Sequence, residues 1–335
     1  MAFENLSERE RAVLANLINH YITTADPVGS RVIATKYQMG LSSATIRNTM
    51  QDLEDLGLIT QPHTSAGRVP TDLGYRLYVD ALIQRETLSE KEEALIRSSI
   101  AGRGRSVEAI LGQSTRALAE IASQMGVTVA PKFESGKLSR LQLVRLSSEK
   151  ILVVLVVRSG LARTVILEVE ASLPEEELRL LESILNERLA GLSLGEIRGA
   201  VSDRLTGVEG NPRLLKLFVD PDSSIWRGGE AQMHIMGAEN LLCQPEFADR
   251  AQLVEFVRAL QDESKLIGEL STDHDNTEAP GVMVKIGSEN SLSEMKRCSV
   301  VSANYKIGHI EGKIAVIGPT RMRYSKLLSI VEYAT

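Results

Sequence analysis

The sequence lacks the features of secreted, metal-stabilised and membrane-spanning proteins. Its two cysteines, Cys243 and Cys298, lie far apart in 335 residues, which argues against a disulfide framework or a cysteine-based zinc site. The longest apolar run, Ile151–Val157, is far shorter than the roughly 20 residues that cross a bilayer. Residues Met1–Arg11 are polar and carry acids, unlike an export signal. These absences predict a cytoplasmic protein without a membrane anchor.

Sequence patterns of enzymes are also missing. There is no G-x-S-x-G motif, no phosphate-binding loop and no dinucleotide fingerprint, and the glycine-rich Gly308–Gly318 lacks the Lys-Ser/Thr of a phosphate loop. Asp273-His274-Asp275 suggests a metal site, but a solvated acidic loop is the simpler interpretation. No other histidine has a partner at ligand spacing. We therefore expect no enzyme activity, no cofactor and no bound metal.

Length and charge set the scale of what is present. A chain of 335 residues corresponds to two or three domains, and 43% hydrophobic residues suffice for sizeable cores. The net charge of −6 excludes a protein that coats nucleic acid through a basic surface. Any contact with DNA must come from a local patch.

The stretch Pro27–Arg68 has the pattern of a helix-turn-helix. A short helix over Ser30–Gln38 precedes a turn at Gly40, a residue that can take the left-handed conformation that ends helices. A second helix, capped by Ser42 or Ser43, follows. In this motif the second helix lies in the major groove of DNA.

The second helix has an apolar face and a polar face. Spacings of four, three and three place Ile46, Met50, Leu53 and Leu56 on one side, which we expect to pack inward. Polar residues of the types that contact base edges occupy its N-terminal half, and acids follow them. An ordinary solvated amphipathic helix is the alternative. The polar residues are Ser43, Thr45, Arg47, Asn48 and Gln51, and the acids are Asp52, Glu54 and Asp55.

The flanking segments extend this pattern to a winged helix. A capping box at Ser7–Glu10 opens a preceding helix, and Leu58-Ile59 and Val69 form wing strands around the loop Gln61–Gly67. The flexible loop is tipped by a cation, Arg68, which suits contact with phosphates or the minor groove; a surface hairpin with a chance arginine is the alternative. We expect base contacts from Thr45, Arg47, Asn48 and Gln51, and phosphate or wing contacts from Arg31, Ser42, Ser43, His63, Ser65 and Arg68.

The remainder alternates between strand and helix patterns. Strands are predicted near 141–143, 151–157 and 164–169, a helix over 174–189, and strands near 282–286, 298–303 and 313–317. Strands, a helical interruption and further strands indicate one α+β domain with an insertion over roughly 192–240. Within it, Trp226, Met233 and Met236 lie either in an interface between two chains or in the insertion's own core. Ala101–Ser106 (AGRGRS) is a candidate hinge.

Several motifs resemble the HrcA family of heat-inducible transcription repressors. Residues Leu6–Leu82 are similar almost without gaps, through PVGSR (27–31), SSATIRN (42–48) and QPHTSAGR (61–68). Three later segments also match, NLLCQPEF (240–247), IGSEN (286–290) and GKIAVIGPTRMRY (312–324). The resemblance spans the chain, more loosely in the middle.

The resemblance implies a fold and a function. The fold is a multidomain α+β protein with a winged helix at 1–86, a helical linker at 87–106, a GAF-like domain at 107–191 plus 241–335, and an inserted dimerising domain at 192–240. The function is repression of chaperone operons by a homodimer on double-stranded DNA, at the inverted-repeat operator CIRCE, with release on heat stress and modulation by the GroEL chaperonin. The alternative is a regulator gated by a small molecule in the GAF-like domain.

Overall fold

The computed structural model describes residues 6–335 except 65, 102–106, 132, 170–173, 209–211, 222, 227–231 and 272–280. The chain forms two compact units. The first comprises Met1–Thr128, Met233–Asn304 and Lys313–Thr335, and the second comprises Val129–Gln232 and Tyr305–Gly312. No helix of the described residues is both long enough and apolar enough to cross a membrane.

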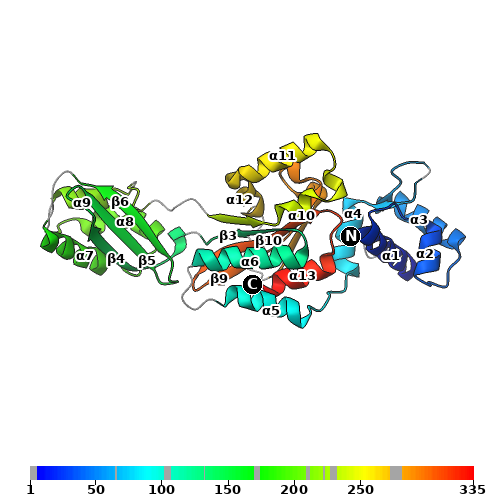
Figure 1. The fold of residues 1–335 in the computed structure, drawn as a ribbon, viewed down its shortest axis with the longest axis horizontal. Coiled ribbons are helices and arrows are strands. Elements are labelled where there is room, and N and C mark those ends of the chain that lie inside the picture. The colour runs from blue at the N-terminus through cyan, green and yellow to red at the C-terminus, as the bar shows by residue number, and fades with distance from the viewer. Residues whose placement is uncertain are drawn as a thin grey trace. The chain divides into compact units, whose positions relative to one another are not determined.

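The N-terminal part of the first unit is a winged helix (Figure 1). The capping box is confirmed, since Ser7 N donates to Glu10 Oε2 at 2.7 Å and Ser7 Oγ accepts from Glu10 N. Ile46, Met50 and Leu53 pack inward as expected, but Leu56 is 52% exposed because it caps the end of its helix. The elements are α1 (Glu8–Thr24), α2 (Ser30–Lys36), α3 (Ser43–Asp55), β1 (Ile59–Thr60), β2 (Val69–Pro70), α4 (Asp72–Leu77) and the π-helical turn η1 (Tyr78–Leu82).

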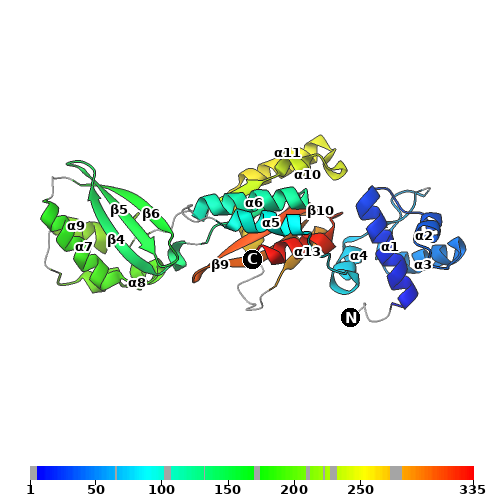
Figure 2. The same cartoon turned by 60° about the horizontal axis from the view of Figure 1, so that its bottom comes forward.

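The rest of the first unit is an α+β domain around a five-stranded sheet with the strand order β7-β3-β10-β9-β8. Figures 1 and 2 show α5, α6 and α13 grouped beside this sheet, and α6 lies so close to β3 that a Cβ on Gly126 would be 2.7 Å from the Thr115 carbonyl oxygen. Its strands are β3 (Met125–Val129), β7 (Met233–Met236), β8 (Met283–Ile286), β9 (Cys298–Ile307) and β10 (Ile310–Pro319). Its helices are α5 (Glu90–Ile100), α6 (Val107–Ala122), α10 (Ala238–Leu242), α11 (Arg250–Gln261), α12 (Glu263–Ser271) and α13 (Tyr324–Tyr333), with 3₁₀ turns at Pro245–Phe247, Gly287–Glu289 and Ser293–Met295.

The candidate hinge AGRGRS does not join two domains. Its residues 102–106 lie outside the described part of the chain, but α5 and α6 on either side of it pack together, and Ser99 Oγ donates to Ser114 Oγ at 3.4 Å. The segment therefore connects two helices of one domain. The chain leaves the winged helix earlier, through residues 83–89.

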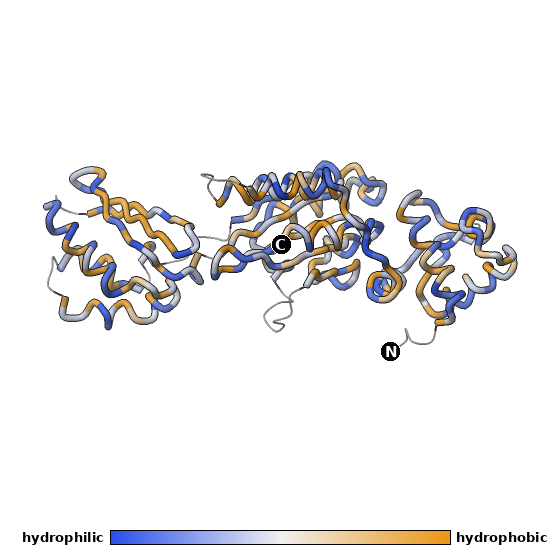
Figure 3. The backbone as a smooth tube through the Cα atoms, turned by 90° about the horizontal axis from the view of Figure 1, so that it is seen from below, coloured by the Kyte–Doolittle hydropathy of each residue, from blue (hydrophilic) through white to orange (hydrophobic). Residues whose placement is uncertain are grey.

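The second unit has its own sheet and core. Its strands β4 (Leu138–Arg145), β5 (Lys150–Val157) and β6 (Ala162–Glu168) form an antiparallel meander, in which Figure 3 shows hydrophobic residues running along the strands. Alternate residues of the strands pack on α7 (Glu175–Leu189), α8 (Leu194–Leu205) and α9 (Pro212–Val219), and a 3₁₀ turn lies at Phe133–Ser135. The first three strands expected in the α+β domain, near 141–143, 151–157 and 164–169, thus belong to the insertion.

This corrects the expected domain boundaries in the middle of the chain. The insertion begins near Val129 and not at 192, because β4, β5 and β6 share a core with α8 and pair with no strand of the five-stranded sheet. Trp226 is fully buried in that core, where its Nε1 donates to the Phe218 carbonyl at 2.8 Å, so it is not available at an interface. Met233 and Met236 lie half-buried on β7, outside the insertion.

Candidate nucleic-acid interface

One face of α3 is polar and exposed, and two of its side chains, Arg47 and Asn48, have no partner within the described residues. Arg47, Asn48 and Gln51 share this face with Ala44, opposite the buried Ile46, Thr49, Met50 and Leu53. Within the described residues, Arg47 and Asn48 make no hydrogen bond or ion pair, so their donors and acceptors are available to another molecule. Arginine pairs with guanine and asparagine with adenine in the major groove. A helix face of this kind has the chemistry to recognise base edges.

Hydrogen bonds fix the N-terminus of α3. Ser42 is the N-cap, since its Oγ accepts from Thr45 N at 3.1 Å, and it also lies 2.9 Å from Thr45 Oγ1. Ser43 Oγ lies 3.1 Å from Ser30 Oγ, which ties the first turn of α3 to that of α2. The first turn of α3 contains no acid, so the partial positive charge of the helix terminus is not neutralised. Ser42, Ser43 and Thr45 therefore set the position of the helix as well as lining its exposed end.

Two of the three acids of α3 bond to neighbours in the same domain. Asp55 accepts from Gln51 Nε2 at 3.0 Å, and Glu54 forms an ion pair with Arg68 at 2.8 Å. Sequence patterns did not reveal either role. The Arg68 cation therefore offsets the negative charge of Glu54 on the recognition helix.

Hydrogen bonds and a close backbone approach hold the wing in its conformation. Gln61 Nε2 donates to the carbonyls of Thr64 and Ala66, each at 2.9 Å, and so holds the loop together. Val28 pairs with Arg68 through two backbone hydrogen bonds, and a Cβ on Gly67 would lie 2.5 Å from the Val28 carbonyl carbon. Only glycine fits there without movement of the backbone. His63 is exposed on the loop, and Ser65 lies outside the described residues.

Arg68 does not occupy the position expected for it. It lies at the base of the wing and not at its tip, because its backbone pairs with Val28. Its side chain is 19% exposed and is held by Glu54 of α3. Arg68 therefore fixes the wing against the recognition helix. Arg31, by contrast, is exposed in the first turn of α2.

The described residues do not meet the requirements of a metal site. The described residues contain no group of three or more His, Cys, Asp or Glu side chains placed to hold an ion. Asp273, His274 and Asp275 lie outside the described residues.

The fold and this surface define a winged helix-turn-helix DNA-binding protein. Residues 5–82 match the family description "Winged helix-turn-helix transcription repressor, HrcA DNA-binding", and residues 108–328 match "HrcA protein C terminal domain". The chain belongs to the HrcA family of heat-inducible transcription repressors, which are DNA-binding regulators and not enzymes.

Full-length relatives support this assignment. The chain is 37% identical to the heat-inducible transcription repressor HrcA of Geobacter sulfurreducens, with 98% of this chain and 96% of the relative aligned. It is 36% identical to that of Chlorobium phaeobacteroides, with 99% and 97% aligned. A solved structure described as that of a hypothetical protein has a TM-score of 0.63 and 25% identity, and the superposition covers 98% of this chain and 96% of the other.

Proposed function

We propose that this protein represses chaperone operons in the cytoplasm by binding, as a homodimer, the inverted-repeat operator CIRCE. The observation that carries the proposal is the α3 face, where Arg47 and Asn48 are exposed and unpaired among the described residues. Two copies of such a helix match the two arms of an inverted repeat, because a two-fold protein fits a two-fold site. Membership of a family of heat-inducible repressors agrees with this role.

The proposed contacts divide by chemistry. Arg47, Asn48 and Gln51 read base edges, and Thr45 assists them from the first exposed turn. Gln51 exchanges its exposed hydrogen bond to Asp55 for a base, at little net cost. Arg31, Ser42, Ser43, His63 and Ser65 contact the phosphate backbone, whereas Arg68 acts indirectly by fixing the wing.

The dimer contact is proposed on the second unit. Residues 152, 154 and 156 of β5 point away from its core, and cross-strand pairing places Val144 and Ile166 on either side of Leu152. Val144 is 45% exposed and Ile166 is 58% exposed, so the described residues leave this apolar sheet face uncovered. Exposed apolar patches on a folded domain mark interaction sites. A second copy is the occupant that an inverted-repeat operator requires.

The α+β domain is assigned as GAF-like. Numbered along the chain, its strands lie in the order 2-1-5-4-3, which supports that assignment. The GAF-like assignment and the use of the insertion for dimerisation belong to this proposal.

Loss of operator binding on warming gives a direct test of the proposed heat regulation. Brief warming is expected to abolish operator binding, and cooling with GroEL chaperonin and ATP is expected to restore it faster than cooling alone. The reason is that competence for binding depends on the folded state of the repressor. Gel shifts before warming, after warming and after cooling, with and without chaperonin, measure this. Operator binding that survives warming and ignores chaperonin contradicts the proposal.

A further inference from the structure

Three segments of the α+β domain form a network of bonds that reaches the winged helix, and DNA recognition leaves all three unexplained. They are 240–247, 286–290 and 312–324. Glu289 and the backbone of Ser288 bond to α4, Arg321 bonds to α1, and 240–247 holds Arg321 in place. We call this surface the interdomain contact and define it by Gln244, Glu246, Val284, Ser288, Glu289 and Arg321 on one side, and Ile22, Asp72 and Arg76 on the other.

Arg321 bonds to the C-terminal end of α1. Its Nη1 donates to the Ile22 carbonyl at 2.9 Å, which places a cation at the negative end of the helix dipole. Its Nε donates to Glu246 Oε1 at 2.7 Å and its Nη2 to Gln244 Oε1 at 3.0 Å. The Arg321 side chain is only 12% exposed. One guanidinium therefore joins the two domains in a largely water-excluded position.

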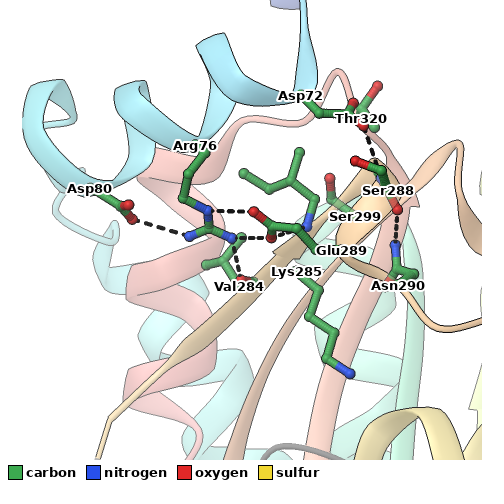
Figure 4. A network of polar contacts seen from close by, with 12 residues as sticks. Asp72, Arg76, Asp80, Val284, Lys285, Ser288, Glu289, Asn290, Ser299 and Thr320 are labelled. Atoms are coloured by element: carbon green, nitrogen blue, oxygen red, sulfur yellow. Dashed lines mark hydrogen bonds and ion pairs between the residues drawn. The ribbon is translucent and has the colours of Figure 1, made fainter. Parts of the chain in front are cut away.

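A second set of bonds holds α4 (Figure 4). Arg76 forms a bidentate pair with Glu289, through Nε at 2.8 Å and through Nη2, and it also donates to the Val284 carbonyl at 2.6 Å. Asp72 accepts from Ser288 N at 2.8 Å. Gly287 has a φ of +52°, and a Cβ there would collide with the Asp72 carboxylate. Glycine at position 287 thus lets this backbone lie directly against Asp72 of α4.

Aromatic side chains pack between the bonds of Arg321 and the bonds of Arg76 and Asp72. The rings of Tyr75 from α4 and Tyr324 from α13 lie 5.8 Å apart, and both are almost fully buried. Burial raises the pKa of the Tyr75 hydroxyl well above its usual value, so the neutral form persists. Apolar packing thereby excludes water around the charged bonds and strengthens them.

The ion pair of the connecting segment is exposed. Glu86 N donates to the Ser325 carbonyl at 3.2 Å, and Glu86 pairs with Arg323 at 2.9 Å. The Arg323 side chain is 64% exposed, and exposed ion pairs contribute little to stability. Arg321 and Arg76, which are more buried and bidentate, are the stronger links.

We propose that the interdomain contact is a positioning device, which holds the winged helix in one orientation against the α+β domain, with Arg321 as its principal residue. Its effect on DNA rests on the proposed function, because only an operator with two arms requires reading heads in a fixed orientation. Loss of Arg321 removes the donor that the Ile22 carbonyl and the partly buried Glu246 carboxylate share, and the winged helix then samples many orientations.

Spin-label distances within one chain test this directly. In a Cys243→Ser background, labels at Arg11→Cys and Glu255→Cys report the separation of α1 and α11, both positions being exposed, while the fully buried Cys298 stays unlabelled. Doubly labelled chains are diluted into an excess of unlabelled chain, so that distances within one chain dominate, and the parent is then expected to give one narrow distance distribution. Arg321→Met is expected to broaden it, with unchanged far-UV circular dichroism. Arg76→Met is measured alongside, so that the outcome does not depend on one variant folding.

Arg323→Met is the matched control. Arg323 lies two residues after Arg321 and is also an arginine, but its ion pair with Glu86 is exposed. It is expected to leave the distribution narrow. A distribution that stays narrow in folded Arg321→Met and Arg76→Met overturns the inference. So does one that broadens equally in Arg323→Met.

A measurement of operator binding separates this inference from the proposed function. Arg321→Met is expected to bind an inverted-repeat duplex about tenfold more weakly. A winged helix without a fixed orientation lowers the effective concentration at which the second winged helix meets the second arm. Failure of the parent to prefer the inverted repeat over scrambled DNA refutes the proposed function and leaves the distance result valid. Unchanged operator affinity in a variant with a broadened distribution refutes the positioning role.

Discussion

Replacing Arg47 with alanine is expected to weaken operator binding by about 1–3 kcal/mol for each arm, or roughly 5- to 150-fold per arm, and to relax specificity at one base pair in each arm. The side chain is exposed on α3 and has no partner in the described structure, so its removal deprives the complex of a bidentate contact without disturbing the free protein. Titrations of labelled duplexes that differ at single positions measure both effects. Thermal unfolding of the variant should match that of the parent.

Arg11→Ala provides the control for Arg47. It removes the same charge from an exposed position on α1, a helix of the same domain that carries none of the proposed DNA contacts. Its effect should be small and equal for all sequences, because only long-range attraction is lost. An equal loss on every sequence for Arg47→Ala would make Arg47 a phosphate contact. No loss at all would remove α3 from the interface.

Placing arginine at Ile166 is expected to convert the proposed dimer to a monomer, with a dimer dissociation constant raised more than about 100-fold. Ile166 lies on the uncovered face of the three-stranded sheet, opposite Leu152 in register. Buried against a second copy, its cation would lack a partner. Sedimentation velocity over a concentration series measures the dissociation constant. Operator affinity should fall in parallel, since a monomer reads one arm at a time.

Leu180→Arg is the control for Ile166. Leu180 is an exposed leucine of α7 in the same unit, and α7 lies on the opposite face of that sheet. It should leave the dimer intact. A dimer that survives Ile166→Arg but dissociates with Leu180→Arg would move the contact to the helical face.

The winged helix could be predicted in detail because its signals are local. Caps such as Ser7 and Ser42 act within four residues, and the inward positions Ile46, Met50 and Leu53 follow from helical period alone. Such patterns depend on near neighbours in the sequence, and the structure confirms them. Leu56 fails because a helix terminus no longer follows the helical period.

The middle of the chain could not be predicted because strand patterns do not say which strands pair. Residues 151–157 were recognisable as a strand, but their partners are β4 and β6 and not the strands after residue 282. The continuous apolar run also has an explanation that periodicity cannot supply. One face packs on α7 and α8, and the other is an exposed apolar surface.

Residue chemistry alone could not decide where single side chains lie. Trp226 is typical of an interface by type, yet its indole fills the core beside Phe218, and its Nε1 finds a carbonyl there. Arg68 is typical of a phosphate contact, yet Glu54 holds it. Both depend on partners that only the folded chain brings close. The interdomain role of Arg321 depends in the same way on the carbonyl of Ile22, which is almost 300 residues distant in sequence.

The central claim is that α3 of this chain recognises an inverted repeat. A competition gel shift tests it most directly, with purified protein, a labelled inverted-repeat duplex, and unlabelled inverted repeat, single arm or scrambled duplex as competitors at physiological salt. Unlabelled inverted repeat is expected to displace the label at concentrations at least about 1,000-fold below scrambled DNA, with the single arm between them. Equal displacement by inverted repeat and scrambled duplex would contradict the claim.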